Sequence, residues 1–285
     1  FSYLKLAASL LCISNFSRRE GLDHLALPKA TVINVSAAID HHFRPLVIEN
    51  NAANQLRRKF GITRPFVLYT GGSDERKNLP RLIQAYAGLS NSLRDTHQLV
   101  LAGKIPKDDI VRFKNQAKAA GLRAEELLFT NHISDEELVK LYNLCKLHVF
   151  PSWHEGFGLP ALEAMSCGAP VIGANTSSLP EVIGLDEALF NPFDVESIGK
   201  KMQQALTEEL FRMRLRQHGL SQAKRFSWDE TAKKAIGAWE AFPRPKPQDQ
   251  KSVQTITRKP RLAFVSPLPP ERTGIADYSA ELLPA

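Results

Sequence analysis

The chain reads Pro151-Ser-Trp-His-Glu-Gly-Phe-Gly-Leu-Pro-Ala-Leu-Glu-Ala-Met-Ser-Cys-Gly-Ala-Pro-Val-Ile172 directly after a short apolar run. Pro160 suits the first position of a helix, and Gly168 suits the end of that helix. Gly156 and Gly158 let the backbone approach a ligand closely, while a helix N-terminus offers unpaired N–H groups to phosphate. The stretch therefore predicts a strand, a glycine turn and a helix that together form a pocket for a nucleoside diphosphate.

Two carboxylates stand eight positions apart in this stretch, Glu155 in the turn and Glu163 in the first turns of the helix. With 18 Glu in 285 residues, this spacing is expected about once by chance and occurs once, so the spacing alone carries little weight. The glycines and prolines between the two acids keep them off one continuous helix. The alternative interpretation is a surface Glu near a helix N-terminus, where the helix dipole favours a negative charge.

Residues 65–240 alternate short apolar runs with helical patterns, which predicts an α/β fold with a doubly wound, Rossmann-like parallel sheet. In such a sheet, ligands bind at the carboxyl ends of the strands. The expected strands are Phe66–Tyr69, Leu99–Ala102, Leu127–Phe129, Leu147–Phe150 and Val171–Ile172. Helices are expected over about 79–93, 108–120, 135–145 and 160–167. Ser134 with Glu137 and Ser227 with Glu230 fit capping boxes, and Gly121 fits a helix end.

Length and composition are typical of a globular protein without a membrane span. The 285 residues are 43% hydrophobic, which is enough to bury one or two sizeable cores. No apolar run approaches the roughly 20 residues that cross a bilayer. Leu6–Ile13 superficially resembles the core of a signal peptide. Because Ser17–Glu20 stands in place of a small-residue cleavage site, we expect a buried helix or strand edge there instead.

Cysteine and histidine usage favours a cytoplasmic protein without a structural metal. Cys12, Cys145 and Cys167 lie far apart without the spacing of a metal site or a redox pair, so packed, reduced thiols are expected. His41 and His42 are adjacent instead of one helical turn apart, and the other histidines also lack metal-ligand spacing.

The net charge of +7 favours anionic partners such as nucleotide sugars or anionic lipid surfaces. The sequence has no long basic run interleaved with aromatic residues, so nucleic acid is not an expected partner.

The stretch His154–Ile172 resembles the donor-site signature of family-four retaining glycosyltransferases, which have the two-Rossmann-domain GT-B fold. Tyr69-Thr-Gly-Gly-Ser-Asp-Glu-Arg-Lys-Asn78 resembles the first donor-domain loop of that family. Further likeness lies, in the same order, in Ile133–Leu138, Ser177–Val182 and Phe226–Trp228. The resemblance covers about residues 10–240 and implies the donor-binding half of such an enzyme.

The resemblance also implies a domain organisation. Residues 1–45 are expected to be the remnant of an amino-terminal GT-B domain, because Cys12–Arg18 and Thr31–Asn34 look like its final strands. Residues 46–242 are expected to form the donor-binding domain, and the proline-rich residues 243–260 a linker. Residues 261–285 resemble the first strand and glycine loop of a second glycosyltransferase module, with a disordered tail as the alternative. We therefore expect a tandem parent enzyme, of which this chain alone is inactive.

Lys77 matches the diphosphate-binding lysine region of the family, and Arg76 stands beside it; the alternative is a solvated pair at a helix start. Many members carry an arginine six positions before that lysine, where this chain has Gly71. Its absence puts one phosphate contact in doubt and leaves Arg76 as a substitute. Glu155 matches the carboxylate that contacts the donor sugar near the reacting carbon.

Glu163 matches the second carboxylate of the signature, which is expected to accept hydrogen bonds from the ribose hydroxyls. Ile133 is expected against the base or simply in the core, and Phe157 equally in the site or in the core. The remaining donor-binding residues implied by the resemblance are Gly72, Gly156, Gly158 and Leu159. No metal or cofactor is expected, because Lys77, Arg76 and a helix terminus can neutralise the diphosphate.

The resemblance implies transfer of a hexosyl group to a polysaccharide or lipid-linked acceptor at the cytoplasmic side of the membrane, with peripheral membrane contact and a second module as partner. The loop Gly71–Asn78 and the tandem layout resemble polysaccharide mannosyltransferases, which suggests GDP-mannose as donor. Two alternatives stay open, a non-catalytic nucleotide-sugar-binding module and a phosphorylase or epimerase on the same fold.

Overall fold

The computed structural model describes residue 7, residues 9–27 and residues 32–241. The chain divides into two units, residues 1–242 and 243–285, and all described elements belong to the first. The expected linker and the expected second module lie outside the described residues.

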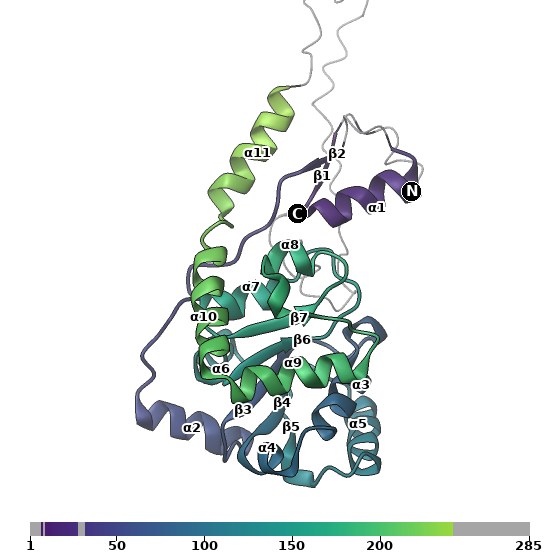
Figure 1. The fold of residues 1–285 in the computed structure, drawn as a ribbon. Coiled ribbons are helices and arrows are strands. Elements are labelled where there is room, and N and C mark those ends of the chain that lie inside the picture. The colour runs from purple at the N-terminus through teal and green to yellow at the C-terminus, as the bar shows by residue number, and fades with distance from the viewer. Residues whose placement is uncertain (1–6, 8, 28–31, 242–285) are drawn as a thin grey trace, which may run out of the picture. The chain divides into compact units, whose positions relative to one another are not determined.

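Six parallel strands form the main sheet in the order β5-β4-β3-β6-β7-β8 (Figure 1). The chain builds outward from β3 to one side, returns to β6 beside β3, and continues to the other side. This is the doubly wound order, which confirms the predicted fold and places the switch point between β3 and β6. The strands are β3 (Phe66–Thr70), β4 (Gln98–Ala102), β5 (Leu127–Phe129), β6 (Leu147–Phe150), β7 (Val171–Ala174) and β8 (Leu189–Phe190). Only β8 was not predicted.

Two groups of helices flank the sheet (Figure 1). One group is α3 (Leu79–Ala87), α5 (Lys107–Ala119) and α9 (Val195–Thr207). The other is α2 (Asn50–Phe60), α6 (Asp135–Leu144), α7 (Leu159–Ser166) and α10 (Glu209–Ala223). Shorter or peripheral elements are the 3-10 helices η3 (Glu75–Lys77), η4 (Ala124–Glu126) and η5 (Asp186–Ala188), and the helices α4 (Asn91–Thr96), α8 (Leu179–Ile183) and α11 (Trp228–Glu240).

The helix expected over 79–93 is two helices, so that prediction is wrong in its second half. α3 ends at Ala87, and the N–H of Gly88 closes its last turn by donating to Gln84. Ser90 then caps a new helix, α4, by accepting a hydrogen bond from the N–H of Leu93. A helix stop and an N-cap within three residues override the helical periodicity.

Other local predictions are confirmed with small shifts. Ser134 and Glu137 form a complete capping box at the start of α6, whereas Ser227 caps α11 through the N–H of Glu230 alone. Gly168 follows α7 with φ +77°, in the left-handed conformation that favours glycine. α7 begins at Leu159, so Pro160 is its second residue instead of its first.

The amino-terminal residues form a separate parallel pair, β1 (Leu10–Cys12) and β2 (Val32–Asn34), joined through helix α1 (Asn15–Leu25). β2 lies within the strand expected over Thr31–Asn34. The strand expected over Cys12–Arg18 is wrong beyond Cys12, because Ser14 caps α1 and Asn15–Arg18 form its first turn. Leu11 and Ile13 are about half exposed, so the expectation of a buried element is wrong for these side chains. Among the described residues β1 pairs only with β2, which leaves its other edge without a partner strand.

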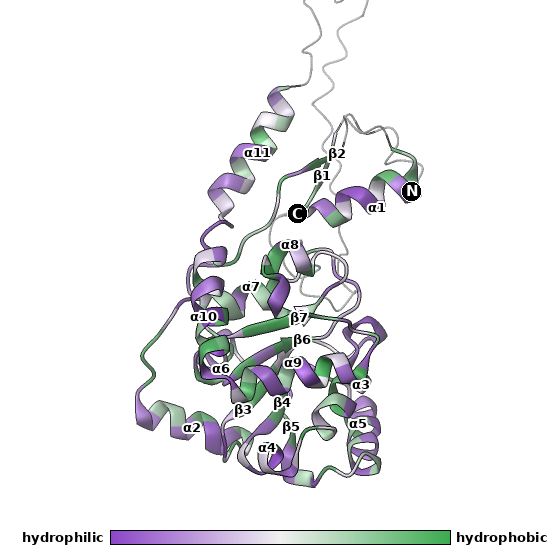
Figure 2. Ribbon diagram, in the orientation of Figure 1, coloured by the Kyte–Doolittle hydropathy of each residue, from purple (hydrophilic) through white to green (hydrophobic). Residues whose placement is uncertain are grey.

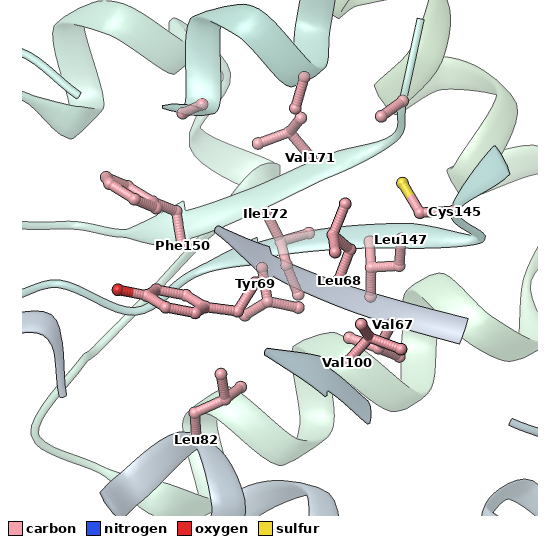
Figure 3. Close-up of a cluster of buried hydrophobic side chains, with 14 of the residues drawn as sticks. Val67, Leu68, Tyr69, Leu82, Val100, Cys145, Leu147, Phe150, Val171 and Ile172 are labelled. Atoms are coloured by element: carbon pink, nitrogen blue, oxygen red, sulfur yellow. The ribbon is translucent and has the colours of Figure 1, made fainter. Parts of the chain in front are cut away.

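The core lies between the sheet and its helices. Figure 3 shows side chains from β3, β4, β6 and β7 meeting there, including Tyr69, Val100, Phe150 and Ile172. In Figure 2 the central strands are hydrophobic and the outer surface of α5 is mostly hydrophilic. None of the helices in the described ranges is both long and apolar enough to span a bilayer.

Candidate functional site

The candidate site lies at the carboxyl ends of β3 and β6, the two strands at the switch point of the sheet. The loop after β3 carries Arg76 and Lys77, and the loop after β6 carries Glu155. Because parallel strands end at the same edge of a sheet, two segments 78 residues apart in sequence meet there.

Glu155 binds both basic residues at once. Its Oε1 lies 2.6 Å from Lys77 Nζ, and its Oε2 lies 2.7 Å from Arg76 Nη1. The side chains of Lys77 and Glu155 are 11% and 10% exposed, which rules out the solvated helix-start pair for Lys77. Arg76 is 41% exposed and also binds Asp74 at 2.9 Å. One carboxylate therefore shares two cations, one buried and one reaching solvent.

Backbone contacts lock the two loops together. The N–H of Trp153 donates to the carbonyl of Arg76 at 3.0 Å, and Arg76 Nη1 donates to the carbonyl of His154 at 3.1 Å. Asn78, buried and left-handed at φ 60°, donates its side-chain amide to the carbonyls of Pro151 and Pro192. The Lys77–Glu155 pair is thus held by a rigid frame, not by two mobile side chains alone.

The turn that carries Glu155 is fixed by the segment Ser177–Val182. Ser177 Oγ accepts a hydrogen bond from the N–H of Glu155 at 3.1 Å. The fully buried hydroxyl of Ser178 lies 2.9 Å and 2.8 Å from the carbonyls of Glu155 and Phe157, and its one proton is shared between them. The segment Ser177–Val182 therefore holds the turn in place through hydrogen bonds to its backbone.

Close packing requires a glycine at one position of the turn, Gly158. Gly158 caps α7 with φ +105°, and a Cβ there would lie 2.6 Å from Leu179. The carbonyl of Gly156 accepts a hydrogen bond from Ser17 of α1 at 3.0 Å. Leu159 opens α7, and the carbonyl of Gly72 in the other loop accepts a hydrogen bond from the buried Tyr69 hydroxyl at 2.7 Å.

Gly71, where the family resemblance suggests an arginine, adopts φ +142°. A Cβ at this position would lie 2.7 Å from the hydroxyl of Tyr69. Both the backbone conformation and the packing therefore disfavour any side chain here, and Arg76 is the second cation of the described site.

Glu163 forms no salt bridge with a basic side chain among the described residues. Its Oε2 accepts a hydrogen bond from the hydroxyl of Tyr142 on α6 at 2.8 Å. Burial raises the pKa of Glu163 to about 7. The two signature carboxylates thus sit in unlike surroundings, one against cations and one against a neutral hydroxyl.

The remaining predicted residues lie at the periphery of the site. Phe157 is buried and packs edge-on against Phe226 with ring centroids 5.5 Å apart, which favours its core interpretation. Ile133 is partly buried against the core, just before α6. Sequence reasoning missed Tyr142, Ser177 and Ser178 as neighbours of the acids, although two of them stand in a segment that carries the resemblance.

Two cavities of about 350 and 370 Å³ lie in the described unit. One is lined in part by Phe157, Glu181 and Phe226, and the other in part by Asn78 and Trp153. Neither lining contains the Lys77–Glu155 pair, whose charges meet directly. In the ranges that the structure describes, no group of three or more His, Cys, Asp or Glu side chains has the geometry of a metal site.

The family model described as "Glycosyl transferases group 1" matches residues 53–222, which include all of the main sheet. The chain belongs to this family. It is 40% identical over 230 residues to the serotype-specific mannosyltransferase WbdA of Escherichia coli, covering 81% of this chain and 28% of that protein. It is 34% identical over 240 residues to the O-antigen chain mannosyltransferase B of Escherichia coli, covering 83% of this chain and 61% of that protein.

The fold is also found in solved glycosyltransferase structures. The structure of Anabaena HepE in complex with UDP and glucose superposes with a TM-score of 0.72 at 17% identity, covering 83% of this chain and 64% of that one. This likeness shows the fold alone. Solved structures that are named glycosyltransferases superpose as well, which confirms that the doubly wound unit has GT-B architecture. The chain spans little more than a quarter of the length of WbdA.

Proposed function

We propose that this chain is the donor-binding half of a retaining glycosyltransferase, which moves a sugar from a nucleoside diphosphate to a hydroxyl of a polysaccharide or glycolipid. The observation that carries the proposal is the buried Lys77–Glu155 pair, joined by Arg76, at the switch point of the sheet. Membership of the glycosyl transferases group 1 family supports the reaction class.

The difficult step is the departure of the diphosphate. The bond from the anomeric carbon to the phosphate oxygen breaks, and its electron pair stays on that oxygen. Lys77 and Arg76 supply fixed positive charge, and α7 begins directly after the turn with the positive end of its helix dipole. Charges held in place before the reaction stabilise the developing anion most effectively.

Glu155 has a different part in this proposal. Each of its carboxylate oxygens already accepts a hydrogen bond from a cation, so it serves as a fixed charge and not as a covalent nucleophile. A negative charge near the anomeric carbon stabilises the positive charge that develops there as the leaving group departs. It also holds Lys77 and Arg76 in place for the diphosphate.

The names of the relatives support a proposal for the donor and the setting. Because two relatives are named mannosyltransferases, we propose a mannosyl donor, GDP-mannose, and an acceptor belonging to a surface polysaccharide. The reaction then takes place at the cytoplasmic face of the membrane, next to further modules of the same parent chain. No metal or cofactor is needed, since the two basic residues and α7 neutralise the diphosphate.

Turnover by the complete protein that carries this chain tests the proposal. Glu155→Ala should lower mannosyl transfer by about 100-fold or more, the loss typical for a preorganised electrostatic group. Glu136→Ala, on the exposed surface of α6, is the matched control and should leave transfer unchanged. Unchanged product with Glu155→Ala would support a non-catalytic binding module instead. Release of nucleoside diphosphate without a glycosylated acceptor would count against transfer.

The donor is identified by thermal shift with a panel of nucleotide sugars. A ligand that binds only the folded protein raises its melting temperature by mass action, so the preferred donor gives the largest shift. GDP-mannose should exceed UDP-glucose. A larger shift with a uridine nucleotide would overturn the mannosyl assignment while leaving the reaction class intact.

A further inference from the structure

A chain of hydrogen bonds runs beneath the candidate site from β6 to α7. His148 Nε2 lies 3.1 Å from Thr70 Oγ1, and Thr70 Oγ1 lies 2.8 Å from the hydroxyl of Tyr142. The Tyr142 hydroxyl in turn donates to Glu163 Oε2 at 2.8 Å. The first three residues are almost completely buried, so water does not compete for these bonds. Four elements, β6, β3, α6 and α7, are thereby connected.

The direction of this chain follows from the chemistry of its two ends. An ionised carboxylate can only accept, so Tyr142 donates its one proton to Glu163. The oxygen of Tyr142 is then left to accept from Thr70, and the oxygen of Thr70 is left to accept from His148. Every proton points toward Glu163.

His148 reinforces this direction from the other end. Burial lowers its pKa to about 3, so the ring is neutral and carries one N–H. Its Nδ1 has no hydrogen-bond partner in the described part of the chain. A buried N–H without an acceptor is rarer and costlier than a buried unpaired acceptor. The proton therefore sits on Nε2, where Thr70 accepts it.

The ring of Tyr142 is also held in place. It meets His148 edge-on with centroids 5.5 Å apart and Phe43 edge-on at 6.1 Å. A tyrosine fixed in this way presents its hydroxyl to one oxygen of Glu163. Among the described residues, no hydrogen bond engages the other oxygen.

We propose that His148, Thr70 and Tyr142 form a one-way donor relay that positions Glu163 as a hydrogen-bond acceptor for a ligand diol. The proposal deepens the donor-binding function and rests on it. The three residues are positioning residues, because they act on the ligand only through Glu163. A relay that supplies donors keeps Glu163 an acceptor, whereas a protonated Glu163 would point its own proton into the relay.

The groups around Glu163 determine how its pKa changes when the relay is removed. Burial and the charge of Asp135 on α6 raise the pKa of Glu163, while the hydroxyl of Tyr142 and the charge of His42 lower it. Cys167, after α7, interacts with the same carboxylate. Tyr142→Phe removes one of the two lowering influences, so Glu163 should hold its proton to higher pH and accept ligand hydroxyls less well at neutral pH.

Titration of the Glu163 carboxyl by carbon NMR in the unliganded chain tests the relay without any ligand. Tyr142→Phe should move the midpoint upward, by about one pH unit for a lost hydrogen bond to a charged group. Thr70→Val, one link further back, should give a smaller shift in the same direction. Tyr86→Phe is the matched control, because Tyr86 is another fully buried tyrosine, whose hydroxyl donates to the carbonyl of His97. An unmoved midpoint in Tyr142→Phe overturns the relay.

Calorimetry with GDP between pH 6 and 9 then tests the consequence for binding. At pH 7 Tyr142→Phe should bind about fivefold more weakly than wild type and recover at pH 9, when Glu163 is mostly ionised in both. 2′-Deoxy-GDP lacks one hydroxyl of the diol. The ratio of its affinities for wild type and Tyr142→Phe should therefore be smaller than the same ratio for GDP. Equal affinity ratios for the two nucleotides would overturn the assignment of the diol as the ligand of Glu163. If wild type binds no nucleotide while the NMR shift is present, the donor-binding function fails and the relay stands.

Discussion

The two carboxylates of one sequence signature, Glu155 and Glu163, stand in opposite surroundings. Glu155 lies in a turn between two cations, Lys77 and Arg76, and balances charge. Glu163 lies on a helix against the neutral hydroxyl of Tyr142, where burial raises its pKa to about 7. Two chemically identical groups eight residues apart thus acquire different electrostatic properties from their neighbours alone.

This difference follows from the elements that carry each acid. The turn after β6 ends at the edge of the sheet, where the loop after β3 can place basic side chains opposite it. α7 instead packs against α6 and α10, so a side chain on its inner surface meets buried hydroxyls. The edge of the sheet therefore holds an ion pair, and the surface of α7 holds a carboxylate with a neutral hydrogen-bond donor.

Removing the buried cation, Lys77, should disrupt its ion pair with Glu155 and give the largest effect on stability. Lys77→Met leaves Arg76 as the one cation of the two that still pairs with Glu155. Loss of one partner of a buried ion pair lowers the free energy of unfolding by about 3 kcal/mol or more. Binding of GDP should weaken as well. Urea denaturation measures the first effect and calorimetry the second.

Lys200→Met is the control for Lys77→Met. Lys200 pairs with Glu196 on the surface of α9, and both side chains are about three-quarters exposed. Exposed pairs contribute little because water and salt screen them, so stability should not change measurably. A drop as large for Lys200→Met as for Lys77→Met would show that burial is not what gives the Lys77–Glu155 pair its importance.

The neutral half of the comparison should show itself in the pH dependence of stability. The pKa of Glu163 is about 7 in the folded chain against a usual value of 4.5, so between these pH values only the folded chain holds the proton. The free energy of unfolding therefore falls as pH rises through this window. Relative to Glu163→Gln, wild type should lose about 3 kcal/mol between pH 4.5 and pH 8. Parallel curves for the two proteins would mean that Glu163 titrates normally.

Most of the sheet and the charged half of the site could be predicted from the sequence. Apolar runs such as Leu99–Ala102 mark buried strands, and glycine with proline marks the turn that carries Glu155. The break between α3 and α4 was missed because helical periodicity continues across Gly88 while the caps end the helix. Local pattern gives the elements, and capping decides their ends.

The neutral half of the site could not be predicted in the same way. Thr70, Tyr142 and His148 come from three separate elements, and no local pattern indicates that their polar atoms meet. One signal was present, since His148 is a polar residue inside the otherwise apolar strand Leu147–Phe150. A polar group in a fully buried strand needs a partner, and the search for that partner leads to Thr70.

The smallest expected effect concerns Gly71, which stands where many members of the family carry an arginine. Gly71 adopts φ +142°, and a Cβ there would lie 2.7 Å from the hydroxyl of Tyr69. Gly71→Ala should therefore cost about 1 to 2 kcal/mol of stability through backbone strain and displacement of Tyr69. Gly72→Ala is the matched control, because its Cβ would meet nothing closer than Asp74 Oδ2 at 3.8 Å.

Urea denaturation of the two variants tests whether packing excludes a side chain at position 71. If Gly71→Ala unfolds as wild type does, the loop has room for a side chain, and the second cation could return to position 71. If Gly71→Ala alone is destabilised, the fold of this loop excludes a side chain there. Arg76, reaching Glu155 from the 3-10 turn η3, then carries the charge that position 71 cannot.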